Sequence, residues 1–140
     1  MLLRYFVFVF LISSCALFAK KKEDLLKSGL KEIRENLLLY EEGKLPDTFK
    51  NPLSLTLEFS NYSSRFYLHF YRSVGFYFES LFFKKKNKFL LEKELLKKAQ
   101  KDMQEAFSAP YGEKEEAKIW QETYQLALID IAYRAVSYTH

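Results

Sequence analysis

Cysteine, glycine and proline are all scarce in this chain, and so are residues that often catalyse reactions. A single cysteine, Cys15, excludes an internal disulfide and a zinc site built from cysteines. Four glycines and three prolines are too few for a loop-rich or low-complexity chain. The only histidines are His69 and the C-terminal His140. These shortages favour regular secondary structure and leave little material for acid–base chemistry.

Sequence motifs that bind cofactors or hold catalytic groups are also missing. The chain contains no G-x-S-x-G, HExxH, P-loop or GxGxxG pattern. A Cys–His pair is excluded if Cys15 is lipidated or removed with a signal peptide. We therefore expect no enzyme activity, no cofactor and no metal. A hydrolase is the weakest hypothesis, which a cluster of acids with a histidine in one cleft would revive.

The composition supports one folded domain with a substantial core. The 140 residues are 49% apolar and 18% aromatic, while charged residues make up 29%. A domain of this length can bury a single core and still present a well-solvated surface. The formal net charge of +4 is mild, and nucleic-acid-binding proteins usually carry a denser basic stripe. We therefore expect no nucleic-acid partner.

The first twenty residues, MLLRYFVFVFLISSCALFAK, have the layout of a secretory signal peptide. One cation, Arg4, precedes an apolar stretch, and small residues follow before the cysteine. The stretch from Tyr5 to Ala19 is fifteen residues long, shorter than the ~20 that a helix needs to cross a bilayer. We predict that residues 1–19 are a signal peptide or membrane anchor and that residues 20–140 form a single helical domain.

The order Ile12-Ser13-Ser14-Cys15 resembles the lipobox of bacterial lipoproteins, which is an aliphatic residue, two small residues and a cysteine. The resemblance implies that Cys15 is diacylated, becomes the first residue of the mature chain and anchors it to a membrane of the cell envelope. Two alternatives stay open. Cleavage after Ala19 would release a secreted or periplasmic protein, whereas an uncleaved anchor would use the lysines at 20–22 as its charged flank.

The mature chain begins with an amphipathic helix. Its apolar residues recur at steps of three and four, which places them on one face. The pattern ends at Gly43 and Pro46, residue types that typically close a helix. The apolar face consists of Leu26, Leu30, Ile33, Leu37 and Tyr40.

Residues 53–83 allow two interpretations. Apolar and polar residues alternate in the first part, which favours a strand, and the many aromatic residues raise its β-propensity. At 100° per residue, however, the polar side chains of Arg65, His69 and Arg72 fall within one arc of a helix. We predict a helix over about 63–83, with a β-hairpin or meander within 53–83 as the alternative.

Two further helices are predicted after a lysine-rich turn at 84–88. The break at 108–112 between them contains proline and glycine. The last helix begins in the acidic run 113–116, where carboxylates suit the positive end of the helix dipole. The predicted fold is therefore all-α, a small bundle of antiparallel helices. The apolar stripes are Leu91, Leu95, Ala99, Met103, Ala106 and Phe107 in one helix, and Ala117, Trp120, Tyr124, Leu128, Ile131 and Ala135 in the other.

Two helical patterns together resemble one tetratricopeptide repeat. Tyr71-x-x-Val74-Gly75-x-x-Phe78 is similar to the first helix of that repeat, and Ala99, Met103 and Ala106 followed by Pro110 are similar to the second. The resemblance covers about residues 65–110. It implies that the two helices pair closely through small residues, which here are Gly75 and Ala99. In the strand interpretation Gly75 would instead be the turn of a hairpin.

Two groups of side chains are candidates for binding. Arg65, His69 and Arg72 share one helical face and would suit an anion or a carboxylate, although a partly exposed polar edge is the ordinary explanation. An aromatic group would line a groove for a peptide or lipid, or would form part of the core. Its members are Tyr71, Phe78, Trp120 and Tyr124.

The sequence thus favours a function in binding over a function in catalysis. We expect an exported, lipid-anchored adaptor or scaffold of the cell envelope whose partner is another envelope protein. A binding protein for a small apolar ligand or peptide is the alternative, with its pocket between the aromatic helix and the last helix. The lysines at 84–86 and 88 are interpreted as a solvated turn. An exposed apolar patch would favour the adaptor, and a deep enclosed pocket would favour the ligand-binding protein.

Overall fold

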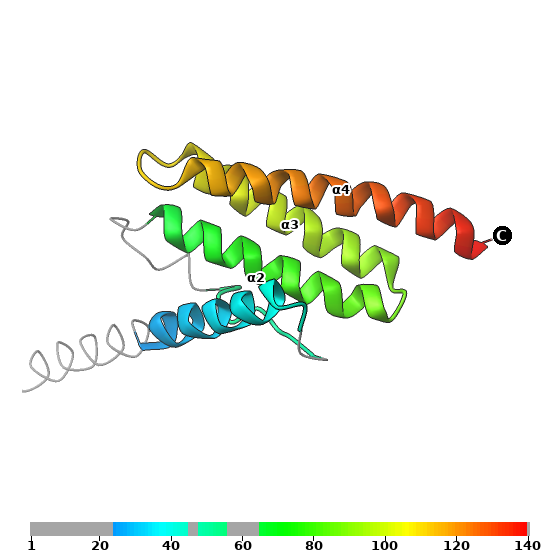
Figure 1. Ribbon diagram of the computed structural model, residues 1–140, viewed down its shortest axis with the longest axis horizontal. Coiled ribbons are helices and arrows are strands. Elements are labelled where there is room, and N and C mark those ends of the chain that lie inside the picture. The colour runs from blue at the N-terminus through cyan, green and yellow to red at the C-terminus, as the bar shows by residue number, and fades with distance from the viewer. Residues whose placement is uncertain (1–23, 45–47, 56–64, 140) are drawn as a thin grey trace, which may run out of the picture.

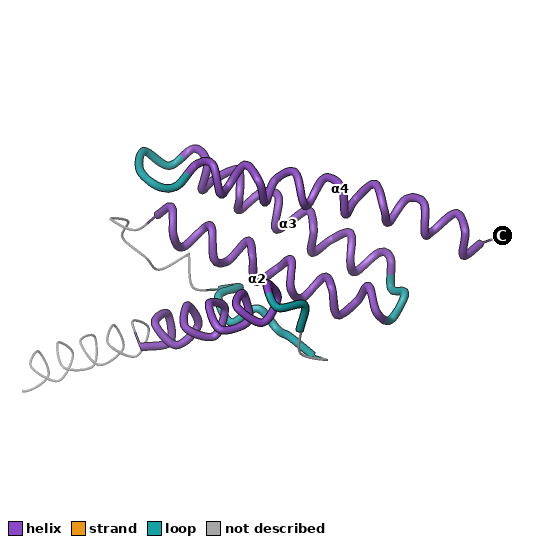
Figure 2. Tube along the Cα trace, in the orientation of Figure 1, coloured by secondary structure: helices purple, strands orange, loops and turns teal. Residues whose placement is uncertain are grey.

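A computed structural model describes residues 24–44, 48–55 and 65–139 of the chain. Residues 24–41 are helical, and three longer elements follow: α2 (Arg65–Lys85), α3 (Phe89–Ser108) and α4 (Lys114–Thr139). The described ranges contain no strand (Figures 1 and 2). The predicted all-α bundle is confirmed. The signal-like segment with Cys15, together with residues 56–64, lies outside the described residues.

The three long helices run antiparallel in chain order, and α3 packs against both α2 and α4 (Figure 1). The helix at 24–41 lies along the other side of α2. Its last turn reaches the core through Tyr40, whose hydroxyl is 3.3 Å from the hydroxyl of Tyr77 and whose ring lies 5.9 Å from that of Trp120. The start of this first helix and the C-terminus lie at opposite ends of the bundle (Figure 1).

The first helix has the apolar face that the sequence predicts. Ile33 is fully buried, and the other predicted residues of that face pack against the core. The helix ends in a Schellman motif, with Gly43 at a φ of +76°. The amide of Lys44 donates to the carbonyl of Leu39 at 2.7 Å, and the amide of Gly43 donates to that of Tyr40 at 3.0 Å. Glycine is suited here because L side chains rarely adopt this conformation.

The helical interpretation of the aromatic segment is correct from Arg65 onward. Gly75 lies in the middle of α2, which excludes a hairpin turn at that residue. The alternating stretch contributes a turn at 52–55, and the rest of it lies outside the described residues. The lysine-rich turn is solvent-exposed, as expected, and ends α2 with Asn87 in the left-handed conformation at a φ of 55°.

The predicted stripe of α3 is wrong at both ends. Leu91 and Phe107 are exposed, whereas Leu96 is almost fully buried. The reason is that α3 contacts α2 on one side and α4 on another. Its buried face is therefore wider than a single apolar stripe, and Leu91 and Phe107 lie outside it. The predicted stripe of α4 is largely buried, with Leu128 and Ala135 at its margin.

The close contact predicted at Gly75 exists, but its partner is a different segment. A Cβ atom at Gly75 would lie 2.3 Å from Oδ1 of Asn51, in the loop that follows the first helix. The glycine therefore accommodates this loop and not α3. Ala99 does lie at the α2–α3 contact, since it is fully buried and its carbonyl accepts a hydrogen bond from the Ser73 hydroxyl at 2.5 Å.

Candidate functional site

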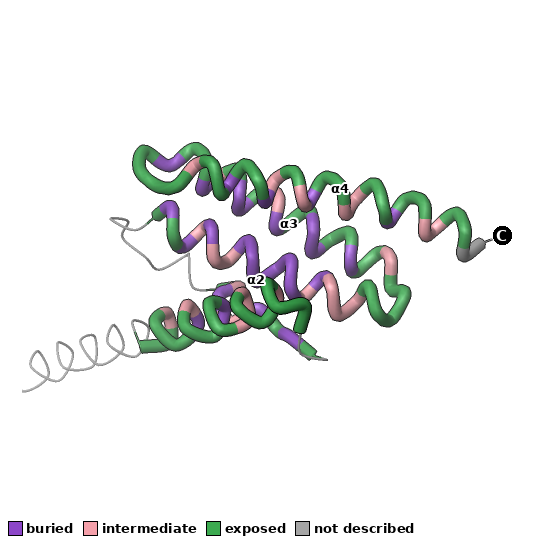
Figure 3. The backbone as a smooth tube through the Cα atoms, viewed as in Figure 1, coloured by how far each residue is buried: buried purple, intermediate pink, exposed green. Residues whose placement is uncertain are grey.

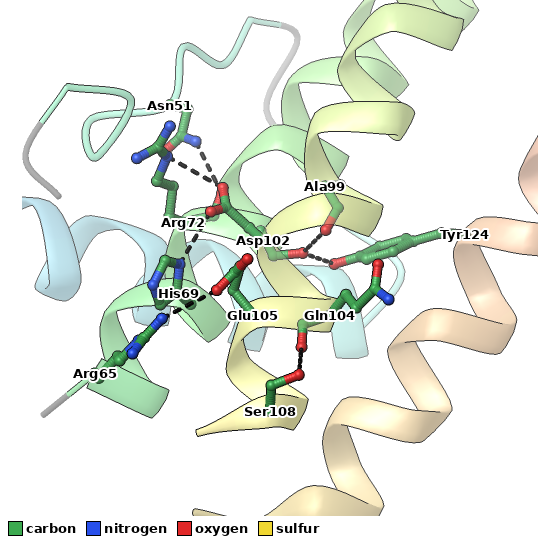
Figure 4. Close-up of polar contacts among 11 residues, drawn as sticks. Asn51, Arg65, His69, Arg72, Ala99, Asp102, Gln104, Glu105, Ser108 and Tyr124 are labelled. Atoms are coloured by element: carbon green, nitrogen blue, oxygen red, sulfur yellow. Dashed lines mark hydrogen bonds and ion pairs between the residues drawn. The ribbon is translucent and has the colours of Figure 1, made fainter. Parts of the chain in front are cut away.

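The cationic face predicted on α2 lies against two carboxylates of α3 (Figure 4). Nδ1 of His69 is 3.2 Å from Oδ1 of Asp102, and Nε of Arg72 is 3.1 Å from Oδ2 of the same residue. One turn away, Nη2 of Arg65 donates to Oε2 of Glu105 at 3.1 Å. Arg65, His69 and Arg72 are therefore brought together, and the carboxylates they face belong to this chain.

The Asp102 carboxylate is nearly enclosed, and its two oxygens face different side chains, His69 and Arg72. Its side chain is 10% exposed, against 24% for Arg72 and 16% for His69. Nε of Arg72 and Oδ2 of Asp102 are close as an ion pair, without the alignment of a hydrogen bond. Because opposite charges already compensate each other here, an external anion would have to displace Asp102. We therefore interpret this polar cluster as a connection between α2 and α3.

Asn51 extends the same network into the loop before α2. Its Nδ2 donates to the carbonyl of Arg72 at 2.9 Å, and its Oδ1 accepts from the amide of Leu53 at 3.0 Å. Its own amide donates to Oε2 of Glu79 at 3.3 Å. The side chain is buried, so these bonds replace the water that it loses on folding. Asn51 thus fixes the loop against the backbone of α2.

A histidine beside two acids is also the arrangement that would revive a hydrolase, so the neighbouring hydroxyl groups matter. Ser73 is fully buried and donates to the carbonyl of Ala99. The hydroxyl of Tyr124 lies 2.9 Å from the same serine oxygen, and burial raises the pKa of this phenol. Neither hydroxyl contacts His69, whose bonded nitrogen faces Asp102. Among the described residues, the cluster therefore shows no contact between His69 and a hydroxyl group of the kind that covalent catalysis uses.

A second ion pair, which sequence reasoning missed, connects α3 with α4. Nη2 of Arg134 donates to both oxygens of Glu92, at 3.0 and 2.6 Å, and Nε donates to Oδ2 of Asp130 at 2.7 Å. The Glu92 side chain is 3% exposed. The hydrogen bonds that Arg134 makes with Glu92 and Asp130 raise the pKa of its guanidinium group above the ordinary value. The sequence spacing could have predicted that Glu92 is buried, because this residue stands three positions before Leu95 and therefore lies on the same side of α3.

The aromatic residues predicted to line a groove occupy two places. Phe78, Trp120 and Tyr124 are buried in the core, where Trp120 and Tyr124 have ring centroids 6.0 Å apart. Both also contact the ring of Tyr77, at 5.6 and 5.4 Å. Tyr71 is half-buried and packs beneath the guanidinium of Arg34, 5.2 Å from the ring centre. The region between α2 and α4 is thus filled by aromatic rings that touch one another.

The largest feature that the sequence analysis overlooked is on the outside of α4. Five apolar side chains there are exposed, each 48% or more, and they follow one another at steps of seven, three, four and three. Figure 3 shows this helix exposed along its outer side while α2 is buried along its centre. We call this set the outer stripe. It consists of Ile119, Leu126, Ile129, Tyr133 and Val136.

Comparison of the chain with known protein families, with curated proteins and with solved structures finds no match. Within the described ranges, no group of histidine, cysteine or acidic side chains is placed to hold a metal ion. None of the helices described is long and apolar enough to span a membrane.

Proposed function

We propose that this protein is an exported, lipid-anchored adaptor or scaffold of the cell envelope that acts through protein–protein contacts and without catalysis. The outer stripe is the observation that carries the proposal. Monomeric soluble proteins rarely leave a row of large apolar side chains on one face of a helix in water unless a partner covers it. The polar cluster around Asp102, by contrast, is already compensated within the chain.

The anchoring part of the proposal rests on the signal-like start of the chain and on Ile12-Ser13-Ser14-Cys15. The bundle geometry is compatible with it, because residue 24 lies at the end opposite the C-terminal half of α4 (Figure 1). A chain attached through its N-terminal segment would present the second half of the outer stripe away from the attachment point. A partner could then reach the stripe without competing with the membrane.

The alternative, a binding protein for a small apolar ligand or peptide, has less support. Its pocket was expected between α2 and α4, where the rings of Tyr77, Trp120 and Tyr124 instead pack against one another. A ligand there would have to separate aromatic contacts that are each worth ~0.5–1.5 kcal/mol beyond their buried area.

The anchoring proposal is tested by expressing the full chain in bacteria with a radioactive fatty acid. We expect label on the wild-type protein, and loss of label with accumulation of the precursor for Cys15→Ser. Ser14→Ala is the matched control, since alanine is also small and should leave processing intact. An unlabelled protein starting at Lys20 would instead support plain secretion, and equal labelling of Cys15→Ser and wild type would contradict acylation at Cys15.

A further inference from the structure

We propose that the connection between α2 and α3 is a docking surface for a bilayer that contains anionic phospholipids. Four lysines occupy five consecutive positions at 84–88, and all four are exposed. Their charge equals the net charge of +4 of the whole chain, so the rest of the chain is neutral on balance. Leu90, which is 80% exposed, follows in the first turn of α3. We call these four lysines and Leu90 the basic tip.

Carboxylates within the chain compensate little of this charge. Among the described residues, Lys84 is the one member of the basic tip within salt-bridge distance of a carboxylate, 3.9 Å from Oδ2 of Asp130. Lys84 and Lys85 also suit the negative end of the α2 dipole. Neither explanation applies to Lys86 and Lys88, which lie beyond the end of α2. A solvated turn accounts for the exposure of these lysines, but it does not account for their number.

Leu90 favours a bilayer over a soluble polyanion as the occupant. A bilayer with anionic headgroups offers phosphates to lysines and acyl chains to an apolar side chain within one contact. A nucleic acid or a polyphosphate would neutralise the lysines and leave Leu90 in water. Lys86 already combines the two kinds of contact, because its ammonium nitrogen lies 4.3 Å from the centre of the Phe82 ring. The basic tip therefore has the composition of an interfacial membrane contact.

The two ends of the bundle differ in charge, which gives the contact a direction. Figure 1 places the α3–α4 connection at the end opposite the basic tip. That connection leads into α4 with Glu113, Glu115 and Glu116, while Lys114 between them donates to backbone carbonyls at the end of α3. Burial and the neighbouring Glu113 raise the pKa of Glu116. An anionic surface would attract the basic tip and repel this acidic end.

This inference deepens the proposed function and rests on it for the choice of membrane, because the proposed lipid at Cys15 brings the chain to the cell envelope. The first helix starts at the end of the bundle opposite the basic tip (Figure 1). Attachment at both ends would lay the long axis of the bundle along the bilayer. The basic tip would thereby fix the orientation in which an anchored chain meets its partner.

The test places an environment-sensitive fluorophore beside the basic tip of the full chain reconstituted in vesicles. Leu91→Cys supplies the attachment site, since Leu91 is 41% exposed in the first turn of α3, and Cys15→Ser removes the other thiol. We expect the emission to shift to the blue in vesicles with equal parts of phosphatidylglycerol and phosphatidylcholine, relative to phosphatidylcholine alone. The shift should vanish at about 1 M salt, where the screening length is about 3 Å. The same fluorophore at Tyr111→Cys, in the α3–α4 connection, should show no difference.

Two triple variants show whether the lysines of the basic tip carry the contact. A lysine near an anionic bilayer favours contact by about fivefold, so replacing those at 85, 86 and 88 by glutamine should lower the ratio of docked to undocked tips roughly 100-fold. The blue shift should then disappear. The matched control replaces the lysines at 97, 101 and 118, which are exposed and lie outside the basic tip. It removes the same charge and should keep the shift.

Several outcomes would overturn the proposal. Equal emission in neutral and anionic vesicles would mean that the tip does not recognise anionic lipid, and equal losses in the two triple variants would mean that only net charge matters. Reversal of the shift by polyphosphate at the same phosphate concentration would indicate a soluble polyanion as the occupant. Circular dichroism checks that the helices of each variant are intact. Because every labelled chain carries Cys15→Ser, failure of acylation and failure of the basic tip are distinguishable.

Discussion

α2 and α4 are both rich in apolar residues, yet the bundle uses them differently. All six residues from Ser73 to Phe78 of α2 are buried, because α3 covers one side of that helix while the first helix and the loop around Asn51 cover the other. α4 carries apolar residues on two sides, and the helices that the structure describes contact it on one. Apolar composition therefore predicts the capacity for burial, and the position of a helix in the bundle decides whether that capacity is used.

The polar groups of α2 and α4 differ in the same way. In α2, the buried Ser73 hydroxyl and the Arg72 carbonyl each have a partner from another segment. In α4, Arg134 is paired with Glu92, whereas the side chains of the outer stripe are aliphatic except for the exposed Tyr133. A partner on the outer stripe would therefore contribute mainly apolar contact, which is non-directional and depends on fit.

Of the substitutions that test this difference between α2 and α4, removal of the Arg134 side chain should lower the unfolding free energy the most. Arg134→Ala would leave the Glu92 carboxylate, 3% exposed, without its main partner. Breaking a buried pair from one side typically costs about 3–5 kcal/mol of unfolding free energy. Urea unfolding followed by circular dichroism would measure the loss.

The double variant Glu92→Leu with Arg134→Met is the control for that experiment. It removes both charges and keeps apolar volume at the α3–α4 contact, so its stability should return close to that of wild type. A loss below ~1 kcal/mol for Arg134→Ala alone, against the range expected for a buried pair, would mean that water reaches Glu92 and that the inner side of α4 is less dry than the structure implies.

Gly75→Ala should have the next largest effect, and it tests what surrounds α2. The new methyl would meet Oδ1 of Asn51 at 2.3 Å, so the asparagine must move and lose hydrogen bonds. Overpacking of this kind costs about 1–3 kcal/mol, more than the ~1 kcal/mol that alanine gains in a helix. Thermal and urea unfolding of the single variants and of their combinations would measure it.

Two partner variants locate the contact. In an Asn51→Ala background the cost of Gly75→Ala should shrink, because the two residues share one contact. Ala99→Leu should also destabilise, but its effect should add to that of Gly75→Ala, because Ala99 lies on α3 at its contact with Ser73 of α2, whereas Gly75 meets Asn51. Coupling between Gly75 and Ala99 in place of coupling between Gly75 and Asn51 would restore the repeat-like pairing that the sequence suggested.

These examples define how much the sequence could predict. Helical periodicity was sufficient for the helices and for most core residues, because step sizes of three and four depend only on local geometry. Contacts between segments were harder: nothing in the residues around Gly75 indicated that its neighbour would be Asn51. Asp102 and Glu92 were missed as partners because the sequence alone does not distinguish a buried, paired carboxylate from an exposed one. That distinction requires the position of the arginine that pairs with it.

The third prediction is that the unfolding free energy falls at alkaline pH because of the tyrosines between α2 and α4. The pKa of Tyr77 is raised above its ordinary 10.0 chiefly by burial, with contributions from Tyr40 and the charge of Glu92, and burial also raises that of Tyr124. The unfolded chain therefore loses these protons first, so stability is retained below pH 10 and falls as pH rises above it. A pKa difference of one corresponds to about 1.4 kcal/mol.

Tyr124→Phe separates the contribution of the Tyr124 hydrogen bond at neutral pH from the contribution of its titration at alkaline pH. At neutral pH the variant should lose about 1 kcal/mol of unfolding free energy, because the bond with Ser73 is removed. Above pH 10 its stability should fall less steeply than that of wild type, since one titrating group is gone. Parallel pH profiles for the two proteins would contradict the assignment of alkaline unfolding to this aromatic contact.

The smallest effect is expected on the outer stripe, where Leu126→Ser should change the stability of the dilute protein by less than ~0.5 kcal/mol. The same substitution at Leu96, 1% exposed, removes a core side chain and should cost about 2–5 kcal/mol, as core leucine truncations do. A large loss for Leu126→Ser in dilute solution would instead show that this side of α4 is covered within the monomer, and the difference between α2 and α4 would disappear.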